Sequence, residues 1–278
     1  YNDTHPRSVI TGSHSVYVKI QEGCMNFCSY CVIPKIRGPF RSRSMESVQR
    51  EIKALKRSGA KEINLIGQDT TLYGVDRYKK GRLSDLLKDA SRIMGSGWIR
   101  LLYTHPAHYD KELIKVVADE PSICKYLDLP IQHISDRILK RMNRKVTRKG
   151  ITGLITELRS RIPGLGIRTS LIVGFPGERE SDFNELLEYV RSAKFDRLGV
   201  FLYSREEGTK AHDFPDQVPD EEKTRRFDAL MEVQKEVSVE INNKYMGRSR
   251  RVLIDEKDKN EPGRYIGRTE HDAPEVDG

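Results

Sequence analysis

The sequence predicts an α/β protein in which an open (β/α)6 partial barrel is followed by a small all-β module. Six short runs of strand-forming residues alternate with helical stripes between residues 16 and 203, which favours parallel strands joined by right-handed crossovers. Six units are too few for a closed eight-stranded barrel. An open doubly wound sheet also fits the alternation, and of the two we predict the partial, TIM-like barrel.

The elements of the barrel follow from the spacing of apolar residues. In the first unit, residues 16–20 alternate as a strand does, Ser44 is a suitable helix N-cap, and Gly59 ends the helix. The other expected strands cover residues 63–66, 99–103, 126–129, 167–173 and 198–203. Helices between them are marked by apolar stripes around Leu86, Ile114, Ile155 and Leu187.

The strand–helix alternation does not continue to the end of the chain. A long helix is expected from about residue 220 to 244, and strand-like runs follow at 250–255 and 265–268. We therefore divide the chain into a leader or linker at 1–14, the barrel at 15–218, a connecting helix at 219–244, and the start of a β module at 245–278. That module is expected to be incomplete, since small β domains need several strands. The polar start without an initiator Met suggests a fragment or a processed chain.

The composition is typical of a soluble globular protein, with 32% charged and 37% hydrophobic residues. No apolar run is long enough to cross a bilayer, so we expect no membrane partner. The net charge of +8 permits a polyanionic partner, and a well-solvated basic surface explains it equally well. Three of the four cysteines lie within eight residues, which favours metal binding in a reducing, cytoplasmic compartment.

The clustered cysteines Cys24, Cys28 and Cys31 follow the first predicted strand with C-x3-C-x2-C spacing. Thiolates are the usual ligands of iron–sulfur clusters, and loops at the carboxyl ends of strands carry the site in parallel barrels. Three cysteines on a four-iron cluster leave one iron without a protein ligand. A structural zinc site prefers four ligands, commonly in two pairs, and only Cys124 or a distant histidine could complete one. We predict a 4Fe-4S cluster with one open iron, and zinc is the weaker alternative.

An aromatic residue, Tyr30, precedes the last cysteine, and the motif resembles the signature of radical S-adenosylmethionine (SAM) enzymes. The continuation at residues 32–43, V-I-P-K-I-R-G-P-F-R-S-R, resembles the methylthiotransferases of that superfamily, and the likeness runs from about Val16 to the end of the chain. It implies that SAM binds at the open iron and is used twice. In one use, an electron from the cluster cleaves SAM to methionine and a 5′-deoxyadenosyl radical, which abstracts hydrogen from the target carbon. In the other, the methyl group passes to sulfur.

The resemblance also implies cofactor-binding residues at the ends of two strands. Gly67 and Gln68 close the second strand, where enzymes of this superfamily contact the amino group of SAM. Gly174 and Glu178 belong to a turn after the fifth strand that resembles the family's cofactor-supporting turn, although an ordinary strand-to-helix turn fits as well. The full expected set is Tyr30, Gly67, Gln68, Gln132, Arg168, Ser170, Gly174 and Glu178.

Some polar residues near this set have two interpretations. Arg168 and Ser170 share one face of the fifth strand and could hold the cofactor carboxylate, but a buried salt bridge explains Arg168 equally well. His105 and His133 follow the third and fourth strands, where a lone histidine is more often a packing or hydrogen-bonding residue. The basic stretch at 140–145 is expected to form a solvated face, with an acidic partner as the alternative.

The resemblance implies a further domain and an electron donor in addition to this chain. Methylthiotransferases of this kind usually have an amino-terminal domain with three further cysteines for a second 4Fe-4S cluster, whereas Cys24 is the first cysteine here. We therefore expect this chain alone to cleave SAM reductively without efficient formation of a methylthio product. An electron donor such as flavodoxin or ferredoxin is also implied, and the sequence does not identify the sulfur donor.

Two branches of the family modify different substrates, an adenosine of transfer RNA or an aspartate β-carbon of small-subunit ribosomal protein twelve. Residues 129–133, L-P-I-Q-H, and residues 267–278 resemble the ribosomal-protein branch, and the trailing module resembles a TRAM domain. Residues 248–278 hold seven Lys or Arg and eight Asp or Glu, so this module carries −1 and the rest of the chain +9. RNA-binding modules concentrate positive charge, and an acidic module suits a basic ribosomal protein.

We therefore predict the ribosomal-protein substrate, with RNA contact secondary. The charge argument fails if Asp272, Glu275 and Asp277 merely form a solvated loop. Methylthiolation of a transfer RNA adenosine is the first alternative. The second, from another class, is a non-catalytic RNA- or protein-binding module built around a structural metal.

Overall fold

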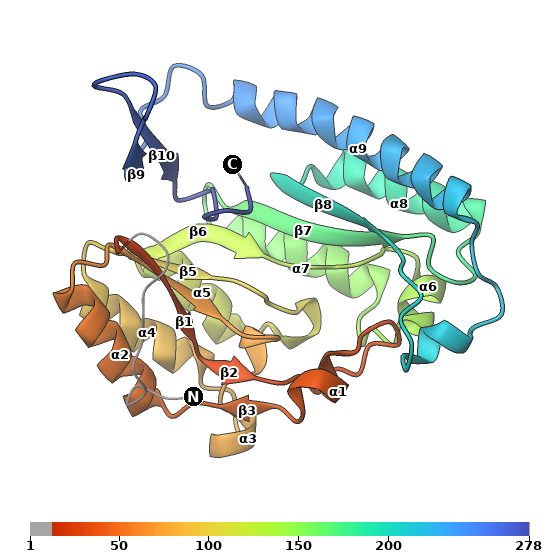
Figure 1. The fold of residues 1–278 in the computed structure, drawn as a ribbon, viewed down its shortest axis with the longest axis horizontal. Helices are drawn as coiled ribbons and strands as arrows, with labels where there is room; N and C mark the ends of the chain where they lie inside the picture. Colours follow the sequence, from red (N-terminus) through yellow and green to blue (C-terminus); the bar gives the residue numbers. More distant parts are fainter. Residues whose placement is uncertain (1–12, 278) are drawn as a thin grey trace.

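The computed structural model describes residues 13–277, so most of the expected leader, and Gly278, lie outside the described residues. Six parallel strands form one sheet: β1 (Ser15–Lys19), β4 (Glu62–Ile66), β5 (Trp98–Leu101), β6 (Ile123–Asp128), β7 (Gly166–Val173) and β8 (Arg197–Leu202). Their order in the sheet is their order in the chain, as Figure 1 shows. A doubly wound sheet reverses its strand order at a switch point. The unreversed order therefore confirms the open partial barrel and excludes the doubly wound alternative.

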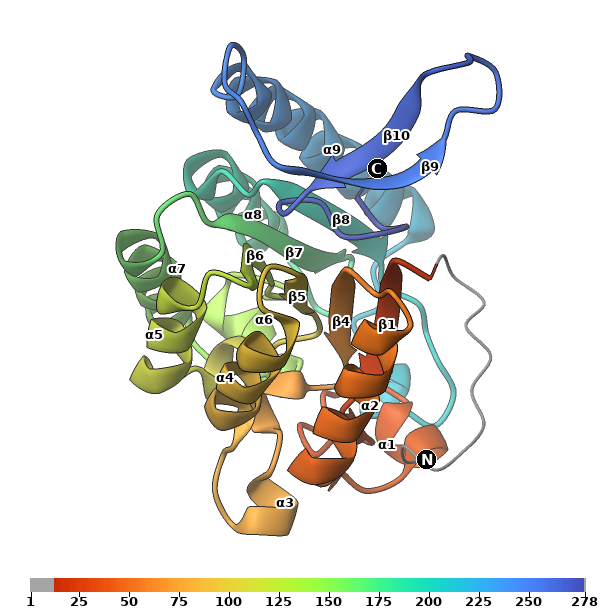
Figure 2. The same cartoon turned by 90° about the vertical axis from the view of Figure 1, so that its left-hand side faces the viewer.

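Helices connect successive strands and cover the outer face of the sheet (Figure 2). The longer helices are α2 (Met45–Arg57), α4 (Leu83–Met94), α5 (Lys111–Asp119), α7 (Arg148–Arg161), α8 (Glu180–Ala193) and α9 (Asp220–Asn243). The Ser44 side chain caps α2 by accepting a hydrogen bond from Ser47 N, as predicted, and Gly59 follows the helix with a φ of 100°. None of the helices in the described part of the chain is long and apolar enough to cross a membrane.

Shorter elements were not predicted from the sequence, because so few residues carry no readable period. These are α1 (Ile33–Arg37), α3 (Val75–Tyr78), α6 (Asp136–Arg141), three 3₁₀ turns at Thr70–Leu72, Pro106–His108 and Lys210–Asp213, and the antiparallel pair β2 (Gln21–Glu22) and β3 (Arg41–Ser42). Most of them lie at the carboxyl ends of the sheet strands, where they shape the loops.

Alternate residues of the strands face the helices and are apolar. Val18, Leu65 and Leu101, on three neighbouring strands, are at most 1% exposed and belong to one large cluster with the helical stripes. Burial of such aliphatic side chains contributes about 1.5–3 kcal/mol each. The period-two pattern thus determines which face of the sheet the helices cover.

The inner, concave face of the sheet is polar. Glu62 on β4 is fully buried there and accepts hydrogen bonds from Ser15 Oγ at 2.7 Å and Arg100 Nε at 2.9 Å. Arg268 Nη1 reaches the same carboxylate at 3.0 Å. The Arg100 guanidinium also lies over the Tyr126 ring, 4.9 Å from its centroid. One buried carboxylate therefore balances two arginines from different parts of the chain.

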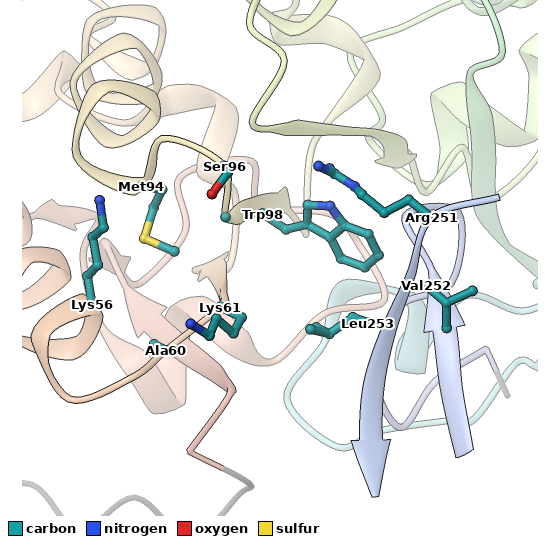
Figure 3. Close-up of a pocket in the computed structure, with 10 residues that line it drawn as sticks. Lys56, Ala60, Lys61, Met94, Ser96, Trp98, Arg251, Val252 and Leu253 are labelled. Carbon is teal, nitrogen blue, oxygen red and sulfur yellow. The ribbon is translucent and has the colours of Figure 1, made fainter. Parts of the chain in front are cut away.

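The β module begins with a hairpin of β9 (Val252–Lys257) and β10 (Tyr265–Thr269) that lies against the amino ends of the sheet strands. Arg251 lies over the Trp98 ring, 5.2 Å from its centroid. These two residues and Leu253 help to line a cavity of about 290 Å³ between the hairpin and β5 (Figure 3). His14 Nε2 contacts Asp255 Oδ1 at 2.8 Å. The hairpin is thus joined to the barrel at the end opposite the cysteine loop.

After β10, residues 270–277 run back into the concave face (Figure 1). Asp272 accepts a hydrogen bond from Arg197 Nη2 at 2.5 Å. The Asp277 carboxylate accepts from Tyr126 OH at 2.5 Å and from Arg168 Nε at 3.1 Å. Acidic groups of the tail therefore neutralise cations of the barrel interior.

These contacts correct the charge argument made from the sequence. Asp272 and Asp277 are neither a solvated loop nor an acidic surface for a partner, because both are paired inside the barrel. Of the three acids considered, Glu275 alone is exposed. A net charge takes no account of which residues form ion pairs, so the value of −1 for this module does not describe its surface.

Candidate metal centre

The three clustered cysteines lie on one loop at the carboxyl end of the sheet. The loop leaves β2 and returns at β3, directly after β1. Cys24, Cys28 and Cys31 are half-buried, and none forms a disulfide. This end of a parallel α/β sheet is where active sites are built, so the position agrees with the predicted ligand role.

Left-handed backbone at two positions shapes the loop. Gly23 has a φ of 78° and Phe27 a φ of 51°. A Cβ added at Gly23 would lie 2.3 Å from the carbonyl oxygen of Pro39, so only glycine fits where the loop returns past its own start. Between the second and third ligands, Cys31 N donates to Cys28 O at 3.1 Å and closes a turn.

Gly23→Ala is expected to lower the iron bound after anaerobic reconstitution several-fold, because the added methyl displaces the residue next to the first ligand. Gly38→Ala is the matched control. Gly38 also has a positive φ, of 71°, but nothing lies within 4 Å of its added Cβ, so that variant carries backbone strain alone, about 1–3 kcal/mol. Equal iron contents in the two variants would show that the close approach to Pro39 does not shape the site.

Two other segments hold the loop in place. Ser29 N donates to Met142 O at 2.9 Å, and Asn143 Nδ2 donates to Phe27 O at 2.8 Å, both from the segment after α6. From the other side, Ala211 N donates to Ser29 O at 2.8 Å. The ligands are therefore positioned by tertiary contacts and not by the loop alone.

Asn26 connects the first ligand to a buried polar network. Its Nδ2 donates to Cys24 Sγ at 3.5 Å and to Asp69 Oδ2 at 2.7 Å. His108 Nε2 lies 2.9 Å from Asn26 Oδ1 and fixes the orientation of the amide. Outer residues of this kind orient metal ligands and tune the metal.

Arg144 reaches the second ligand. Its Nη1 lies 3.8 Å from Cys28 Sγ, and the side chain is only 8% exposed. The sequence predicted a solvated face for residues 140–145, and that prediction is wrong for Arg144, although Lys140 and Lys145 are exposed. The segment turns after α6, so the neighbouring residues Arg144 and Lys145 of one basic stretch lie in different environments.

The cysteine thiols lie in a partly desolvated environment. Burial raises the pKa of the Cys24 thiol and of the Cys31 thiol. Both are therefore protonated at neutral pH in the metal-free protein. Metal ligation requires thiolates, so metal binding releases these protons.

A zinc site is disfavoured by the surroundings of the loop. Cys124 is buried with Trp98 and Ala273 near the start of β6, so it does not supply a fourth ligand. Asp69, His105 and His108 do offer ligand atoms within 4.8 Å of one another. However, His105 Nδ1 accepts a hydrogen bond from Ala107 N at 3.2 Å, so its Nε2 carries the proton of the neutral ring and cannot ligate.

Unpaired polar atoms gather around the loop and fit a polar cofactor. The Gln21 side-chain amide, His105 Nε2 and Arg144 Nε are buried and have no hydrogen-bond partner among residues 13–277. Buried polar groups without partners are rare and often mark a missing ligand or water. Three free thiols beside these groups suit an iron–sulfur cluster carrying a polar, chelating cofactor better than a closed zinc site.

The residues predicted at the end of β4 contact the cysteine loop. Gln68 Oε1 accepts a hydrogen bond from Gly23 N at 2.8 Å. A Cβ at Gly67 would lie 2.3 Å from Gln21 Nε2, so this glycine makes room for the buried Gln21 side chain. The structure thus gives both residues a role in placing the loop, and their contact with the amino group of SAM remains a prediction.

The turn after β7 is held by α9. Gly174 has a φ of 70°, and an added Cβ would lie 2.1 Å from Lys223 Cγ, so the close approach expected here is made by a helix side chain. Glu178 Oε2 accepts from Phe175 N at 3.1 Å, and its other oxygen lies 3.0 Å from Arg226 Nη1. The cofactor roles of Gly174 and Glu178 stay predictions.

The remaining predicted residues lie on neighbouring strands. Arg168 forms ion pairs with Asp128 at 3.3 Å and Asp277 at 3.1 Å, which is the salt-bridge role given as its alternative. Ser170 is buried on the same strand, and its carbonyl accepts from Gln132 N at 2.9 Å. The cofactor contacts of Arg168, Ser170 and Gln132 also remain predictions.

The aromatic and imidazole side chains of the site have packing and turn-forming roles. The ring of Tyr30 meets the Phe175 ring edge-on with centroids 6.4 Å apart, and burial raises the pKa of Tyr30. His133 Nδ1 accepts from Ser135 N at 3.0 Å, as His105 does from Ala107. Burial lowers the pKa of His105 to about 2 and that of His133 to about 3. These bonds fit the hydrogen-bonding interpretation of both histidines, although the Nε2 atom of each ring has no partner among residues 13–277.

Sequence reasoning gave no role in the metal site to Asn26, Asp69, His108 or Arg144. Asn26 sits between two ligands of the motif, and Asp69 follows β4 at the end of the sheet that carries the site, so position alone could have indicated these two. No signal marked His108 or Arg144, because each meets the loop only through the fold.

Comparison with known families gives two matches along the chain. The radical SAM superfamily matches residues 18–190, and the TRAM domain matches residues 246–278. Among solved structures, coproporphyrinogen III oxidase (HemN) from Escherichia coli aligns with a TM-score of 0.57 at 17% identity, covering 86% of this chain and 55% of that one. The methyltransferase TsrM from Kitasatospora setae aligns with a TM-score of 0.56 at 17% identity, covering 68% and 36%. At such identity these structures support the fold alone.

Curated relatives are much closer in sequence. The chain is 49% identical over 278 residues to "Ribosomal protein uS12 methylthiotransferase RimO" of Desulforamulus reducens, covering 100% of this chain and 63% of the relative. The protein of the same name from Desulfitobacterium hafniense is 47% identical, with 100% and 62% covered. The chain therefore spans about three fifths of the length of these relatives.

Proposed function

The chain belongs to the radical SAM superfamily, and we propose that it is the catalytic core of a methylthiotransferase acting on the β-carbon of an aspartate in ribosomal protein uS12. The observation that carries the proposal is 49% identity over the whole chain to a uS12 methylthiotransferase. The three-cysteine loop at the carboxyl end of the sheet gives that identity a chemical basis.

In this proposal Cys24, Cys28 and Cys31 hold a 4Fe-4S cluster, and Gln68 fixes the start of their loop. With SAM at its open iron, the cluster would supply the electron and the radical that the reaction needs. Ser170 and Gln132 would orient the SAM carboxylate from β7 and the neighbouring loop. The ion pairs of Arg168 with Asp128 and Asp277 would keep its guanidinium in place for the same task.

The open side of the sheet supports a macromolecular substrate. β1 and β8 are the two edges of the six-stranded sheet and do not pair with each other. On β8, Phe201 is 55% exposed and Leu202 is 44% exposed. An open wall with apolar side chains at its rim admits a loop of a folded protein, whereas a closed barrel would admit only small molecules.

The rest of the reaction belongs to the whole protein. The relatives are longer than this chain, and the additional length could hold the second 4Fe-4S cluster that the family implies. An electron donor such as flavodoxin or ferredoxin would reduce the enzyme. Oxygen-sensitive clusters and free thiols suit the cytoplasm. We propose all of these for the full-length protein.

The substrate is tested by direct competition. Full-length protein with SAM, reductant and a sulfide source is incubated with uS12, or a peptide copying its loop, and with transfer RNA in one reaction. We expect mass spectrometry to find a methylthio group on an aspartate and none on adenosine. A peptide with that aspartate changed to alanine, and the Cys28→Ala enzyme, are the controls. Methylthioadenosine as the main product would overturn the substrate assignment but not the radical chemistry.

A further inference from the structure

Arg144 differs from the other arginines buried in this chain. Arg100 pairs with Glu62 at 2.9 Å, and Arg226 pairs with Glu178 at 3.0 Å. Arg144 is also buried, at 8% exposure, yet it forms no ion pair with any carboxylate of residues 13–277. The nearby Asp69 carboxylate acts on Arg144 electrostatically without contacting it, so no direct ion pair in the described part of the chain offsets the cost of burying this cation.

The guanidinium is held against the cysteine loop from a separate segment. Arg144 Nη2 donates to Pro130 O at 2.5 Å, and its backbone N donates to Leu139 O at 2.9 Å. These contacts direct Nη1 toward Cys28 Sγ, 3.8 Å away, and leave Nε without a partner. The charge is therefore positioned by α6 and the β6 loop whether or not the thiol has lost its proton.

The group that would balance this charge is the cluster itself. A 4Fe-4S core bound by three thiolates is an anion, and one-electron reduction makes it more negative. Nearby positive charge and hydrogen bonds to the sulfurs favour the reduced state and raise the potential of such clusters. Asn26 donates to Cys24 Sγ without adding charge, and Arg144 is the one buried cation that contacts a ligand sulfur in the described part of the chain.

We propose that Arg144 is the buried counter-charge of the cluster: a positioning residue that sets the reduction potential through the Cys28 sulfur. The inference rests on the proposed cluster and not on the substrate. On this proposal the positive charge of Arg144 makes the cluster easier to reduce. Removing the charge would disfavour the reduced state without altering any iron ligand.

The first test is an EPR-monitored redox titration of the reconstituted protein without SAM. At the midpoint potential of the unmodified protein, Arg144→Met is expected to lower the ratio of reduced to oxidised cluster about tenfold, which for a one-electron couple is a shift of about 59 mV to lower potential. Arg144→Lys keeps a charge and should shift less. Arg148→Met is the matched control, because Arg148 is an exposed cation paired with Glu185 and its loss should leave the ratio unchanged.

The second test uses the metal-free protein and covers the case in which Arg144→Met loses the cluster. In the metal-free protein the Arg144 charge forms no ion pair with the described carboxylates and its Nη2 donates one hydrogen bond, to Pro130 O, so the metal-free variant should melt within about 4 °C of the metal-free unmodified protein. Where the variant does bind the cluster, binding should raise its melting temperature much less than it raises that of the unmodified protein. A metal-free variant that is unfolded, or a titration identical to that of the unmodified protein, would overturn the inference. Absence of iron from the unmodified protein would overturn the proposed function instead.

Discussion

Replacing any one of Cys24, Cys28 or Cys31 by alanine is expected to abolish the brown colour, the bound iron and the reductive cleavage of SAM. Each thiol sits on the one loop at the carboxyl end of the sheet and is free of any disulfide. With only two thiolates left, a second iron would lack a protein ligand, in addition to the iron that is open to SAM. The measurement is iron and sulfide content with the visible spectrum after anaerobic reconstitution, followed by an assay for 5′-deoxyadenosine.

Cys124→Ala is the control for these variants. Cys124 is 1% exposed on the concave face, packed with Trp98 and Tyr126, and burial raises the pKa of its thiol to about 12. It therefore remains a protonated, apolar packing residue, and its loss should leave the iron content unchanged. If Cys124 proves necessary for the cluster, no coordination site remains for the cofactor and the open-iron assignment fails.

Glu62→Gln is expected to cost about 3–5 kcal/mol of unfolding free energy, because it leaves Arg100 buried without a carboxylate partner, whereas Arg268 keeps its ion pair with Asp255. Glu62 is fully buried and accepts hydrogen bonds from Arg100 and Arg268. The change preserves the shape of the side chain but removes the charge and turns one acceptor oxygen into an NH2 donor. Urea unfolding at neutral pH measures the loss. The control, Glu112→Gln, removes an exposed partner of Lys88 and should leave the midpoint unchanged.

The Glu62 carboxylate should also make the stability of the protein depend on pH. Burial raises the pKa of Glu62, but the hydrogen bond from Arg268 and the charges of Arg100 and Arg268 outweigh it, so the net pKa lies below the ordinary value of 4.5. Its contribution to stability is therefore complete above pH 4.5 and is lost as the pH falls through the folded-state pKa. The unmodified protein should lose more stability in that acid range than Glu62→Gln does. Parallel curves would contradict the assigned role of the carboxylate.

Much of the fold could be predicted because its signals are local. Alternation along β7 and the apolar stripe of α2 are readable in a few residues, and both elements form as expected. The strand order could not be read from the alternation, which fits a doubly wound sheet equally well, and it was settled by the structure. The ligands could also be predicted, since Cys24, Cys28 and Cys31 are consecutive in one motif.

What could not be predicted depends on contacts between distant segments. Arg144 lies 116 positions from Cys28, and nothing in its basic neighbourhood distinguishes it from the exposed Lys145. Gly174 was expected to admit a cofactor, but the atom that comes closest to its added Cβ belongs to Lys223 on α9. The acids of the tail were counted as surface charge, whereas Asp277 pairs with Arg168 inside the barrel. In each case the partner, and not the residue itself, determines the role.

The most direct test is Mössbauer spectroscopy of ⁵⁷Fe-reconstituted protein with and without SAM. Three cysteine ligands predict about four irons per chain, with one iron whose signal changes when SAM is added while the others stay the same. Cys124→Ala should give the same spectra. A cluster whose irons are all indifferent to SAM, or a colourless protein that binds one zinc, would contradict a radical SAM site on this loop.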